Sequence, residues 1–501
     1  MRCFVLLLWS GIFTGAVLGA ADNEAGSKSL FNGRDLSGWD GDPRFWSARD
    51  GTITGQTTRE NPLKGNTFLV WRGGTVEDFE LRLSYRIVGG NSGIQYRSKD
   101  LGNWVVGGYQ ADLEAGKKYT GILYEERGRG ILAERGQKTV IDASGKVNVV
   151  GSVGNSDEIL AAIKQADWND YVVVAQGNHM VHRINGRVTV DVTDEQTEKR
   201  VMSGILALQL HAGEPMLIQF KDIRLKRLKP EGTKRLVLVA GTPSHSPGEH
   251  EFNAGVTLLK KCLDPLTGVQ TGVYLNGWPK DPTAFDSADT ILLYMDGGEG
   301  HPIIQGDHLK IVGDLMKKGV GLACVHYAVE VPKNKGGPDF LQWMGGYFET
   351  FWSVNPHWEA DFKELPRHPI TRGVKPFKIK DEWYYHMRFR ENMKDVTPIL
   401  TAIPPDSTRS QPDGSHSGNP DVRAHKGMPE HVAWAFERPG GGRGFGFTGA
   451  HFHKNWGNDS FRKLVLNALL WTAKMEVPPA GVQSKVTAAE LEKHLDLKPA
   501  K

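Results

Sequence analysis

The sequence feature that most constrains the fold is a change of hydrophobic period around residues 226–235. Before it, apolar and polar residues alternate over short runs, as in FELRLSYRI at residues 79–87. After it, continuous apolar runs such as RLVLVAG (235–241) alternate with helix-like runs such as FNAGVTLLKKCL (252–263). A period of two is typical of strands with one buried face, whereas alternating buried strands and helices indicate a parallel sheet. We therefore predict two domains of different class.

The 501 residues exceed what one ordinary core organises, which also favours a multidomain β plus α/β protein. Many short strands with tight turns predict a β-sandwich or jelly roll in the first half, and the second half predicts a doubly wound, flavodoxin-like α/β domain. The expected parts are a signal peptide (1–21), the sandwich (28–228), a charged linker (226–235), the α/β domain (235–475) and a C-terminal tail (476–501).

The first 21 residues have the pattern of an export signal. Arg2 precedes the apolar run FVLLLWSGIFTGAVL, and small residues lead to a cleavage point near Ala21. The alternative is an uncleaved membrane anchor. No later apolar run is long enough to span a bilayer, so we expect no stable membrane insertion once the signal is removed. The expected location is periplasmic or extracellular.

Charge and cysteine content exclude two further classes. The net charge is +3 with both signs interspersed, so the clustered basic face of a nucleic-acid-binding protein is not expected. Beyond Cys3 in the signal segment, the chain has only Cys262 and Cys324. An exported protein with so few cysteines does not depend on a disulfide framework.

A candidate ligand face is visible in the strands of the first half. Strict alternation in NSGIQYR places Gln95 and Arg97 on one face, and in GYQADLE it places Gln110 and Asp112 on one face. Polar side chains repeated on adjacent strands suit a concave, ligand-binding sheet surface. An ordinary solvated face is the alternative.

The ordered motifs of this half resemble the 3-keto-disaccharide hydrolase family. The matching pieces are FNGRDLSGW, DGTITG, DFELRLSYRI, NSGIQYR, GYQADLE, TGILYEE, WNDYVVVAQGN, HRINGR and LALQLHAGEPMLIQFKDIRLKRL. The resemblance implies a concanavalin-like jelly roll in an exported bacterial protein that cleaves 3-keto-glycosides. A 3-keto group acidifies the neighbouring C2 hydrogen, so cleavage can run through elimination and water addition with one base and one acid.

This chain departs from the family where many members have Glu and Gln in a GYEVQ-like motif. Asp112 supplies the nearest carboxylate and is the candidate catalytic base. The side chains expected to contact the substrate are Arg97, Tyr109, Gln110, Tyr124, Glu125 and His211. A structural histidine is an equally good interpretation of His211.

In the second half, VGLACVHYA predicts a sharp turn after a buried strand. A nucleophile elbow needs small residues two positions before and after its tip. Around Cys324 these positions hold Leu322 and His326, which are bulky, whereas around His326 they hold Cys324 and Ala328. His326 is therefore expected at the tip, and Cys324 is expected to be a packed core thiol.

The second half resembles the ThuA-like, trehalose-utilisation family. The matching pieces are VLVAGTPSHSPGEHEF, DTILLYMDGGEGH, GVGLACVHYAVE, GGYFETFWSVNPHW, HPITRGVKPFKIKDEWYYH and GFGFTGAHFHKNWGN. The resemblance implies a class I glutamine-amidotransferase-like fold in which a histidine commonly replaces the amidotransferase cysteine. It also points to breakdown of disaccharides and 3-keto sugars.

Polar residues at several strand ends are expected to gather near His326. Glu382 and His386 in DEWYYH are four apart, and His451 and His453 in GAHFHKN are two apart, so each pair is expected to share a face. His245, Glu249 and His250 follow the first strand. We expect His326 and Glu382 to be catalytic and His386 to bind substrate.

The only cofactor that the sequence suggests is a divalent metal ion, with His326, His451 and His453 as its candidate ligands. Histidines that line a polar cleft without ligating anything are the alternative.

The leading hypothesis is an exported enzyme that cleaves glycosidic bonds of 3-keto-glycosides, with a small saccharide as its partner molecule. The alternative is a carbohydrate-binding sandwich attached to a ThuA-like domain of separate or no activity. A glutamine amidotransferase is disfavoured because the elbow pattern fits His326 rather than Cys324.

Overall fold

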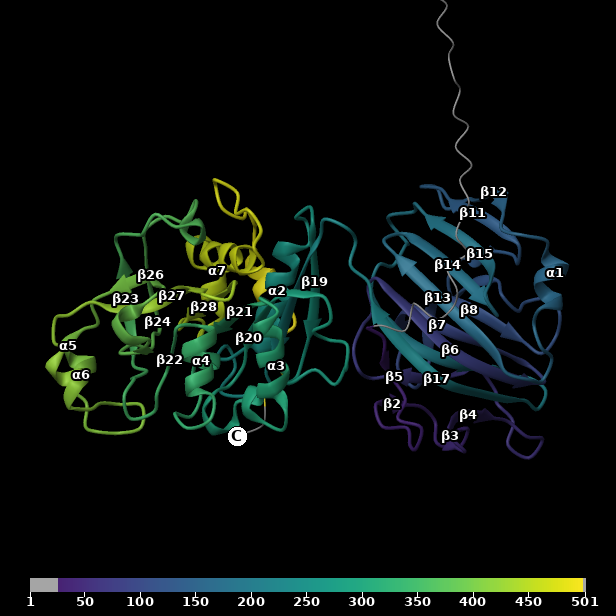
Figure 1. Cartoon of the computed structure of the whole chain (residues 1–501), viewed down its shortest axis with the longest axis horizontal. Coiled ribbons are helices and arrows are strands. Elements are labelled where there is room, and N and C mark those ends of the chain that lie inside the picture. Colours follow the sequence, from purple (N-terminus) through teal and green to yellow (C-terminus); the bar gives the residue numbers. More distant parts are fainter. Residues whose placement is uncertain (1–25, 499–501) are drawn as a thin grey trace, which may run out of the picture.

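The computed structural model describes residues 26–498, which form a β-sandwich followed by an α/β domain (Figure 1). The sandwich, coloured purple to blue, lies beside the α/β domain, coloured teal to yellow. The signal peptide predicted for residues 1–21 lies outside the described residues. None of the helices in residues 26–498 combines the length and hydropathy that a bilayer crossing requires.

Two sheets pack face to face in the sandwich. The larger has the path β12-β11-β15-β14-β13-β6-β17-β4-β3, with β1 paired to β17, and the smaller has the order β10-β9-β8-β7-β16-β5-β2. The strands of the larger sheet are β1 (Lys28–Ser29), β3 (Trp46–Arg49), β4 (Thr52–Gln56), β6 (Phe79–Val88), β11 (Gln137–Ile141), β12 (Val147–Ser152), β13 (Asn169–Gln176), β14 (His179–Ile184), β15 (Arg187–Asp194) and β17 (Leu217–Arg227). The strands of the smaller sheet are β2 (Trp39–Asp40), β5 (Thr67–Trp71), β7 (Asn91–Asp100), β8 (Val106–Glu114), β9 (Leu123–Glu126), β10 (Gly130–Ala133) and β16 (Ile205–Leu210).

Alternation and turn chemistry explain why these residues form strands. Leu81 and Leu83 of β6 are buried in the core between the sheets, and Leu208 of β16 meets them from the smaller sheet. Asn185 and Gly186, which join β14 to β15, both have positive φ, at 49° and 79°. That geometry is the two-residue hairpin turn that an Asn-Gly pair favours.

The α/β domain is built on a mixed sheet with the order β19-β18-β20-β21-β28-β27-β26. The first five strands run parallel, and β27 and β26 continue the sheet in antiparallel fashion. The strands are β18 (Lys234–Ala240), β19 (Val269–Tyr274), β20 (Ala288–Tyr294), β21 (Gly321–Val325), β26 (Val396–Ala402), β27 (Glu430–Arg438) and β28 (Gly442–Phe447). Two small ribbons pair β22 (Gly346–Tyr347) with β25 (Arg388–Phe389) and β23 (His357–Phe362) with β24 (Phe377–Glu382).

Helices cover both faces of this sheet. The α-helices of the chain are α1 (Ser156–Ala161), which lies in the sandwich, and α2 (Phe252–Leu263), α3 (His308–Lys317), α4 (Gly337–Trp343), α5 (Asp406–Arg409), α6 (Pro420–Ala424), α7 (Asp459–Thr472) and α8 (Ala488–Leu491). The short 3₁₀ helices are η1 (Gly298–Gly300), η2 (Pro302–Ile304), η3 (His326–Val329), η4 (Pro369–Thr371), η5 (Glu391–Met393) and η6 (His453–Gly457). Residues of α2 and α7 share one core with Leu236 and Leu238 of β18, whereas α3 and α4 share the other core with Val237 and Val239.

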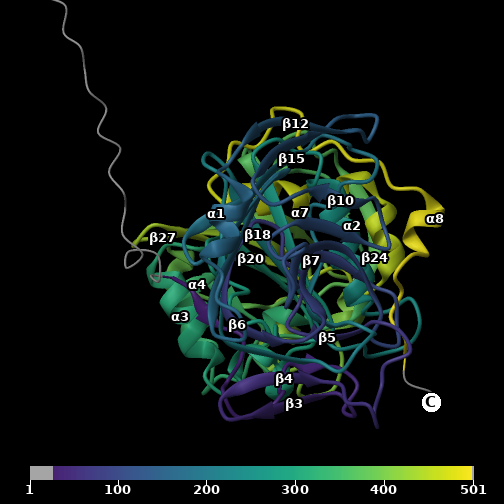
Figure 2. The same ribbon diagram turned by 90° about the vertical axis from the view of Figure 1, so that its right-hand side faces the viewer.

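A buried arginine at the end of β17 connects the two domains. Arg227 donates to Asp281 Oδ2 at 2.6 Å and to Thr283 Oγ1 at 2.9 Å in the α/β domain, and to Glu77 Oε2 at 2.6 Å in the sandwich. Only residues 228–233 separate β17 from β18. Figure 2, viewed from the sandwich side, shows the sandwich strands in front of α2 and α7.

Candidate active site

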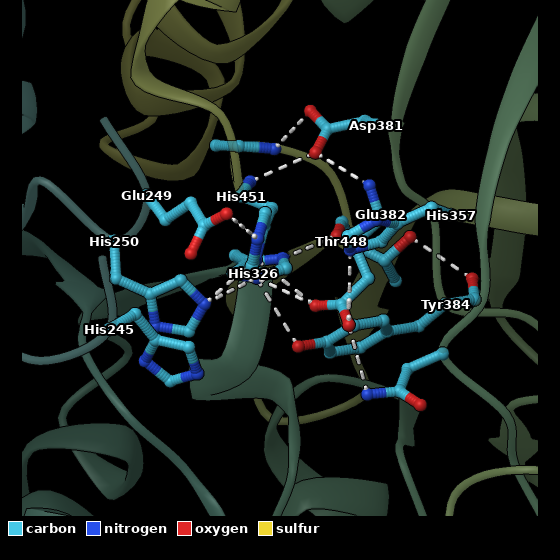
Figure 3. A network of polar contacts seen from close by, with 12 residues as sticks. His245, Glu249, His250, His326, His357, Asp381, Glu382, Tyr384, Thr448 and His451 are labelled. Atoms are coloured by element: carbon cyan, nitrogen blue, oxygen red, sulfur yellow. Dashed lines mark hydrogen bonds and ion pairs between the residues drawn. The ribbon is translucent and has the colours of Figure 1, made fainter. Parts of the chain in front are cut away.

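The carboxyl ends of the parallel strands of the α/β domain bring a cluster of histidines together (Figure 3). His326 follows β21 directly, His451 lies four residues beyond β28, and His250 lies in the connection from β18 to α2. Glu382, the last residue of β24, completes the cluster from outside the parallel sheet. In open α/β sheets ligands bind at this edge.

His326 sits at the sharp turn that the sequence predicts. Its φ is +57°, a left-handed conformation that is strained for a residue with a side chain. The ring is fully buried, and its Nδ1 lies 2.9 Å from the carbonyl oxygen of Thr448. Because a carbonyl only accepts, Nδ1 carries the proton and Nε2 presents a lone pair to the cluster.

His250 is oriented in the same way by a carboxylate. Its Nδ1 lies 2.9 Å from Asp296 Oδ1, just beyond the end of β20. This contact assigns the proton to Nδ1 and leaves Nε2 to face the cluster. The ring of His245 stacks on the ring of His250, with their centroids 3.6 Å apart.

His451 is held by a buried carboxylate of a neighbouring ribbon. The backbone amides of Ala450 and His451 donate to Asp381 at 2.8 and 3.0 Å, and Asp381 is fully buried. His451 in turn points Nδ1 inward, and its Nε2 lies 3.7 Å from Glu249 Oε1.

The inward-facing atoms converge on one point. His250 Nε2 lies 3.0 Å from both His326 Nε2 and His451 Nδ1, which are 3.3 Å apart. Glu382 Oε2 lies 3.2 Å from His451 Nδ1 and 3.4 Å from His326 Nε2. At metal–nitrogen bonds of about 2.0–2.1 Å, the edges of a tetrahedron of ligands measure roughly 3.3–3.4 Å. The four atoms are therefore spaced as the ligands of one divalent ion would be.

The charges in the cluster support the same interpretation. Burial, together with the neighbouring histidines, lowers the pKa of His250 strongly, so this ring is neutral. Burial alone would raise the pKa of Glu382, but His326 and His451 outweigh it and lower that pKa far below the usual range. Glu382 in turn raises the pKa of His451 despite the burial of that ring. Where His451 is neutral, lone pairs and a carboxylate oxygen face one another and repel unless a cation lies between them.

A cavity of about 590 Å³ adjoins the cluster. Two of its lining residues reach Glu382 Oε1: Asn355 donates through Nδ2 at 3.2 Å, and His357 Nε2 lies 3.6 Å away. The other lining residues are Pro356, Ser407, Thr408, Gln411, Gly414, Ser415, His416 and Ser417. A ligand in this space would be in reach of the histidine cluster.

Two residues predicted near His326 lie elsewhere. His386 contacts Glu430, with Nδ1 3.5 Å from Oε1, and stacks on Trp352. His453 begins η6, and its Nε2 lies 3.0 Å from the carbonyl oxygen of Leu491. The shared-face prediction was wrong for both pairs because β24 ends at Glu382 and β28 ends at Phe447, so neither alternation nor helical period continues.

Cys324 is the fourth of the five residues of β21 and is fully buried in the apolar core that includes α3 and α4. Burial raises the pKa of its thiol well above the usual range. A thiol that stays protonated is a poor nucleophile. Cys324 therefore has the surroundings of the packed core thiol that the sequence predicts.

In the sandwich, Asp112 lies in a closed polar network on the face of the smaller sheet turned away from the core. Asn91 and Gln110 donate to its two carboxylate oxygens at 2.7 and 2.8 Å. Gln110 Oε1 accepts from Gln95 at 2.5 Å, and Tyr124 lies directly across from Gln110 on β9. Burial raises the pKa of Asp112 from 3.8 to about 7.

The same face is concave. Gln209 of β16 reaches Glu126 of β9 at 3.3 Å although β7 and β8 lie between these strands. Gln209 Oε1 is buried and, within residues 26–498, has no hydrogen-bond partner. His211 is exposed just beyond β16, with Nδ1 2.6 Å from the carbonyl oxygen of Ala212.

Three residues predicted to contact substrate point away from Asp112. Tyr109 donates to Asp194 at 2.6 Å inside the core, and Glu125 pairs with the buried Arg129. Arg97 does not share a face with Gln95, which corrects the alternation assumed from the sequence. Its φ of +47° and the register shift after Tyr96 form a bulge that turns Arg97 inward.

Buried partners hold Arg97 in that position. It pairs there with Asp78 at 2.9 Å and donates to the carbonyl oxygens of Glu77 and Gly177.

The sequence-based prediction of metal ligands and site residues missed some residues that the structure places at the cluster. His250 and His245 were noted after the first strand but not assigned to the metal, whereas Asp296 and His357 were not selected. Asp296 follows a buried strand directly in YMDGG, which is a signal that sequence reasoning can use. His357 has no such signal, because β23 approaches the cluster only through its pairing with β24.

Family models match both halves of the chain, and the resemblance to two families is confirmed. Residues 26–226 match the 3-keto-alpha-glucoside-1,2-lyase-like domain of the 3-keto-disaccharide hydrolase model. Residues 249–472 match the ThuA model, described as trehalose utilisation. No curated protein matches the chain.

Solved structures resemble each half separately. A proposed glycosyl hydrolase from Parabacteroides distasonis is 19% identical, covering 40% of this chain and 99% of its own, with a TM-score of 0.28. A carbohydrate-binding module from Bacillus subtilis is 14% identical, covering 38% and 95%, with a TM-score of 0.26. A ThuA-like protein from Bacteroides uniformis is 18% identical, covering 49% and 94%, with a TM-score of 0.36.

Proposed function

Because the chain joins a 3-keto-alpha-glucoside-1,2-lyase-like domain to a ThuA domain, we propose that it is an exported enzyme that cleaves glycosidic bonds of 3-keto-glycosides. We place the chemistry in the α/β domain. The observation that carries this assignment is the convergence of His250, His326, His451 and Glu382 beside the 590 Å³ cavity. The parallel strands follow the flavodoxin-like order 2-1-3-4-5, and in such sheets ligands bind at the carboxyl ends of the strands, where the cluster lies.

The donor set fits a divalent transition-metal ion. Imidazole nitrogens and one carboxylate are its usual ligands, and the outer ring nitrogens of His250 and His326 are already engaged by Asp296 and Thr448. Such an ion would supply a Lewis acid for the keto oxygen of the substrate. The predicted ligand His453 is replaced in this proposal by His250.

We assign the proton transfer of the reaction to a residue that lines the cavity. His357 lines the cavity, and the carboxylate of Glu382 orients its ring. We assign His357 to take the C2 proton that the 3-keto group acidifies. Departure of the C1 oxygen would leave a C1=C2 double bond, and addition of water across it would complete the cleavage.

The test is turnover of a 3-keto sugar by the purified chain without its signal. We expect release of 3-keto-glucose from 3-keto-trehalose but not from trehalose, with loss of activity in EDTA and recovery on adding back a divalent metal ion. His326→Ala should lose both the bound metal and the activity. His179→Ala, an exposed histidine of the sandwich, should lose neither. Full activity of the metal-free protein would contradict the assignment.

A second candidate function for the sandwich is saccharide binding. The concave polar face and the unpaired Gln209 Oε1 favour it, since a buried acceptor can receive a sugar hydroxyl. Under this alternative, Tyr124→Ala and Gln209→Ala would weaken glycan binding while leaving turnover of a small 3-keto-disaccharide unchanged. Loss of turnover in both variants would instead place the chemistry in the sandwich.

A further inference from the structure

Glu330 is a buried carboxylate that contacts the cavity wall through His416. It directly follows η3, which begins at His326, and it is 2% exposed. Its oxygens lie 2.9 and 3.0 Å from His416 Nε2, and Thr350 Oγ1 donates to it at 3.2 Å. Among the ion pairs of residues 26–498, that with His416 is the only one that includes Glu330.

The pair places a proton on Nε2 of His416, because an ionised carboxylate only accepts. A buried carboxylate without a cationic partner is costly, and no lysine or arginine in the described chain neutralises this one. The hydrogen bond to Glu330 raises the pKa of His416 despite partial burial of the ring, and the charge of Glu382 adds to the effect. The pair with Glu330 therefore favours the imidazolium form of His416.

The second ring nitrogen faces the cavity. His416 Nδ1 lies 2.9 Å from Ser415 Oγ, and both residues line the cavity together with Asn355 and His357. A backbone hydrogen bond joins two segments of the cavity wall, because the amide of Asn355 donates to the carbonyl oxygen of His416 at 3.1 Å.

A chain of rings connects the pair to the proposed metal site. His416 stacks on Phe348 with centroids 5.2 Å apart, and Phe348 packs against Tyr384 at 5.3 Å. The hydroxyl of Tyr384 lies 3.3 Å from His326 Nε2. The lining of one cavity therefore includes both His416 and His357, and His357 contacts Glu382 of the cluster.

We propose that Glu330, His416 and Ser415 form the general acid that protonates the leaving oxygen of the glycosidic bond. The inference rests on the proposed function. It identifies the residues that carry out the second proton transfer of the proposed cleavage, the one to the leaving oxygen. As the C2–H bond breaks toward the base, its electron pair forms the C1=C2 bond and the C1–O bond breaks. The Ser415 hydroxyl gives its proton to the departing oxygen and receives the Nδ1 proton of His416, which becomes neutral.

The test compares two 3-keto-glucosides whose leaving groups differ in the need for an acid. A sugar alcohol is a poor leaving group and needs protonation, whereas 4-nitrophenolate leaves without it. We expect His416→Asn to reduce turnover of 3-keto-trehalose by about 10²–10⁴-fold and that of 4-nitrophenyl 3-keto-glucoside by less than about tenfold. Metal content should stay that of the wild type, and His425→Asn, a half-buried histidine of the same domain outside the cavity lining, should turn over both substrates normally.

Glu330→Gln provides a second variant that keeps the shape of the side chain, and it should show the same selective loss. Equal loss on both substrates in both variants, with the fold intact by circular dichroism, would overturn the assignment of the acid while leaving the proposed function in place. Normal turnover of 3-keto-trehalose by His416→Asn would overturn it as well. A wild-type protein inactive on both substrates would overturn the proposed function and this inference with it.

Discussion

The polar network around Asp112 and the histidine cluster around His326 are both buried, but they differ in how their atoms are satisfied. In the sandwich, each carboxylate oxygen of Asp112 accepts from an amide, and the network closes on itself through Gln110 and Gln95. In the α/β domain, the outward nitrogens of His250 and His326 are engaged, and the inward nitrogens face one another and Glu382.

This difference separates a polar network that closes on itself from a cluster whose acceptor atoms converge on one point. A closed network contributes to stability without a ligand, whereas convergent lone pairs need a proton or a metal ion between them to be stable. Burial and polarity alone, which the two regions share, would not have told them apart. The predictions below test the contrast, from the largest expected effect to the smallest.

The largest effect is expected for Arg97 of the sandwich, whose partners are all structural. Arg97→Ala leaves Asp78 buried without its cation, and breaking a buried ion pair costs about 3–5 kcal/mol in the free energy of unfolding. Denaturant unfolding of the full chain measures this cost, and the exposed Arg34→Ala serves as the control. A stable Arg97→Ala protein with weaker glycan binding would restore the ligand-binding role predicted from the sequence.

Asp112 should make the stability of the sandwich depend on pH. Its folded pKa of about 7 lies above the ordinary 3.8, so the folded state binds the proton more tightly than the unfolded state does. The free energy of unfolding should therefore fall as pH rises from about 4 to 7, by at most about 4 kcal/mol.

Unfolding of Asp112→Asn at pH 5 and pH 8 checks this expectation, because the variant should lose that part of the dependence. Asp170→Asn, an exposed aspartate of the same domain, should keep it. Parallel pH profiles for the wild type and Asp112→Asn would show that the amide network holds the carboxylate ionised.

Asp296 tests whether the cluster is preorganised for a metal ion. Removing an outer partner of a metal-binding histidine typically costs 10–100-fold in affinity, and Asp296→Asn should weaken metal binding by that factor. Competition with a chelator of known affinity measures the change, and the half-exposed Asp361→Asn is the matched control. Unchanged affinity in Asp296→Asn would mean that His250 does not bind the ion.

The smallest effect is expected for Cys324. Cys324→Ala removes one buried atom from a packed strand and should cost about 1 kcal/mol in stability without changing turnover. Thiol reagents should leave the folded wild-type enzyme active. Inactivation that maps to Cys324 would revive the amidotransferase alternative.

Much of the fold follows from local patterns. Alternation identified strands such as β6, the Asn185-Gly186 pair identified a hairpin, and small residues around His326 identified the sharp turn after β21. These features depend on neighbours within a few residues, so the sequence contains them. The same reasoning failed at Arg97, where a bulge interrupts the alternation, and at His386 and His453, which lie beyond the ends of their strands.

The sequence by itself determined that histidines follow the strands of a parallel sheet, because that depends only on period and order. The tertiary structure decided which of them meet and which ring nitrogen each presents. His326 takes its orientation from Thr448, 122 residues away, and His250 takes its own from Asp296, 46 residues away. Ring orientation is fixed by hydrogen bonds to partners that only folding brings within 3 Å, so no local pattern could have revealed it.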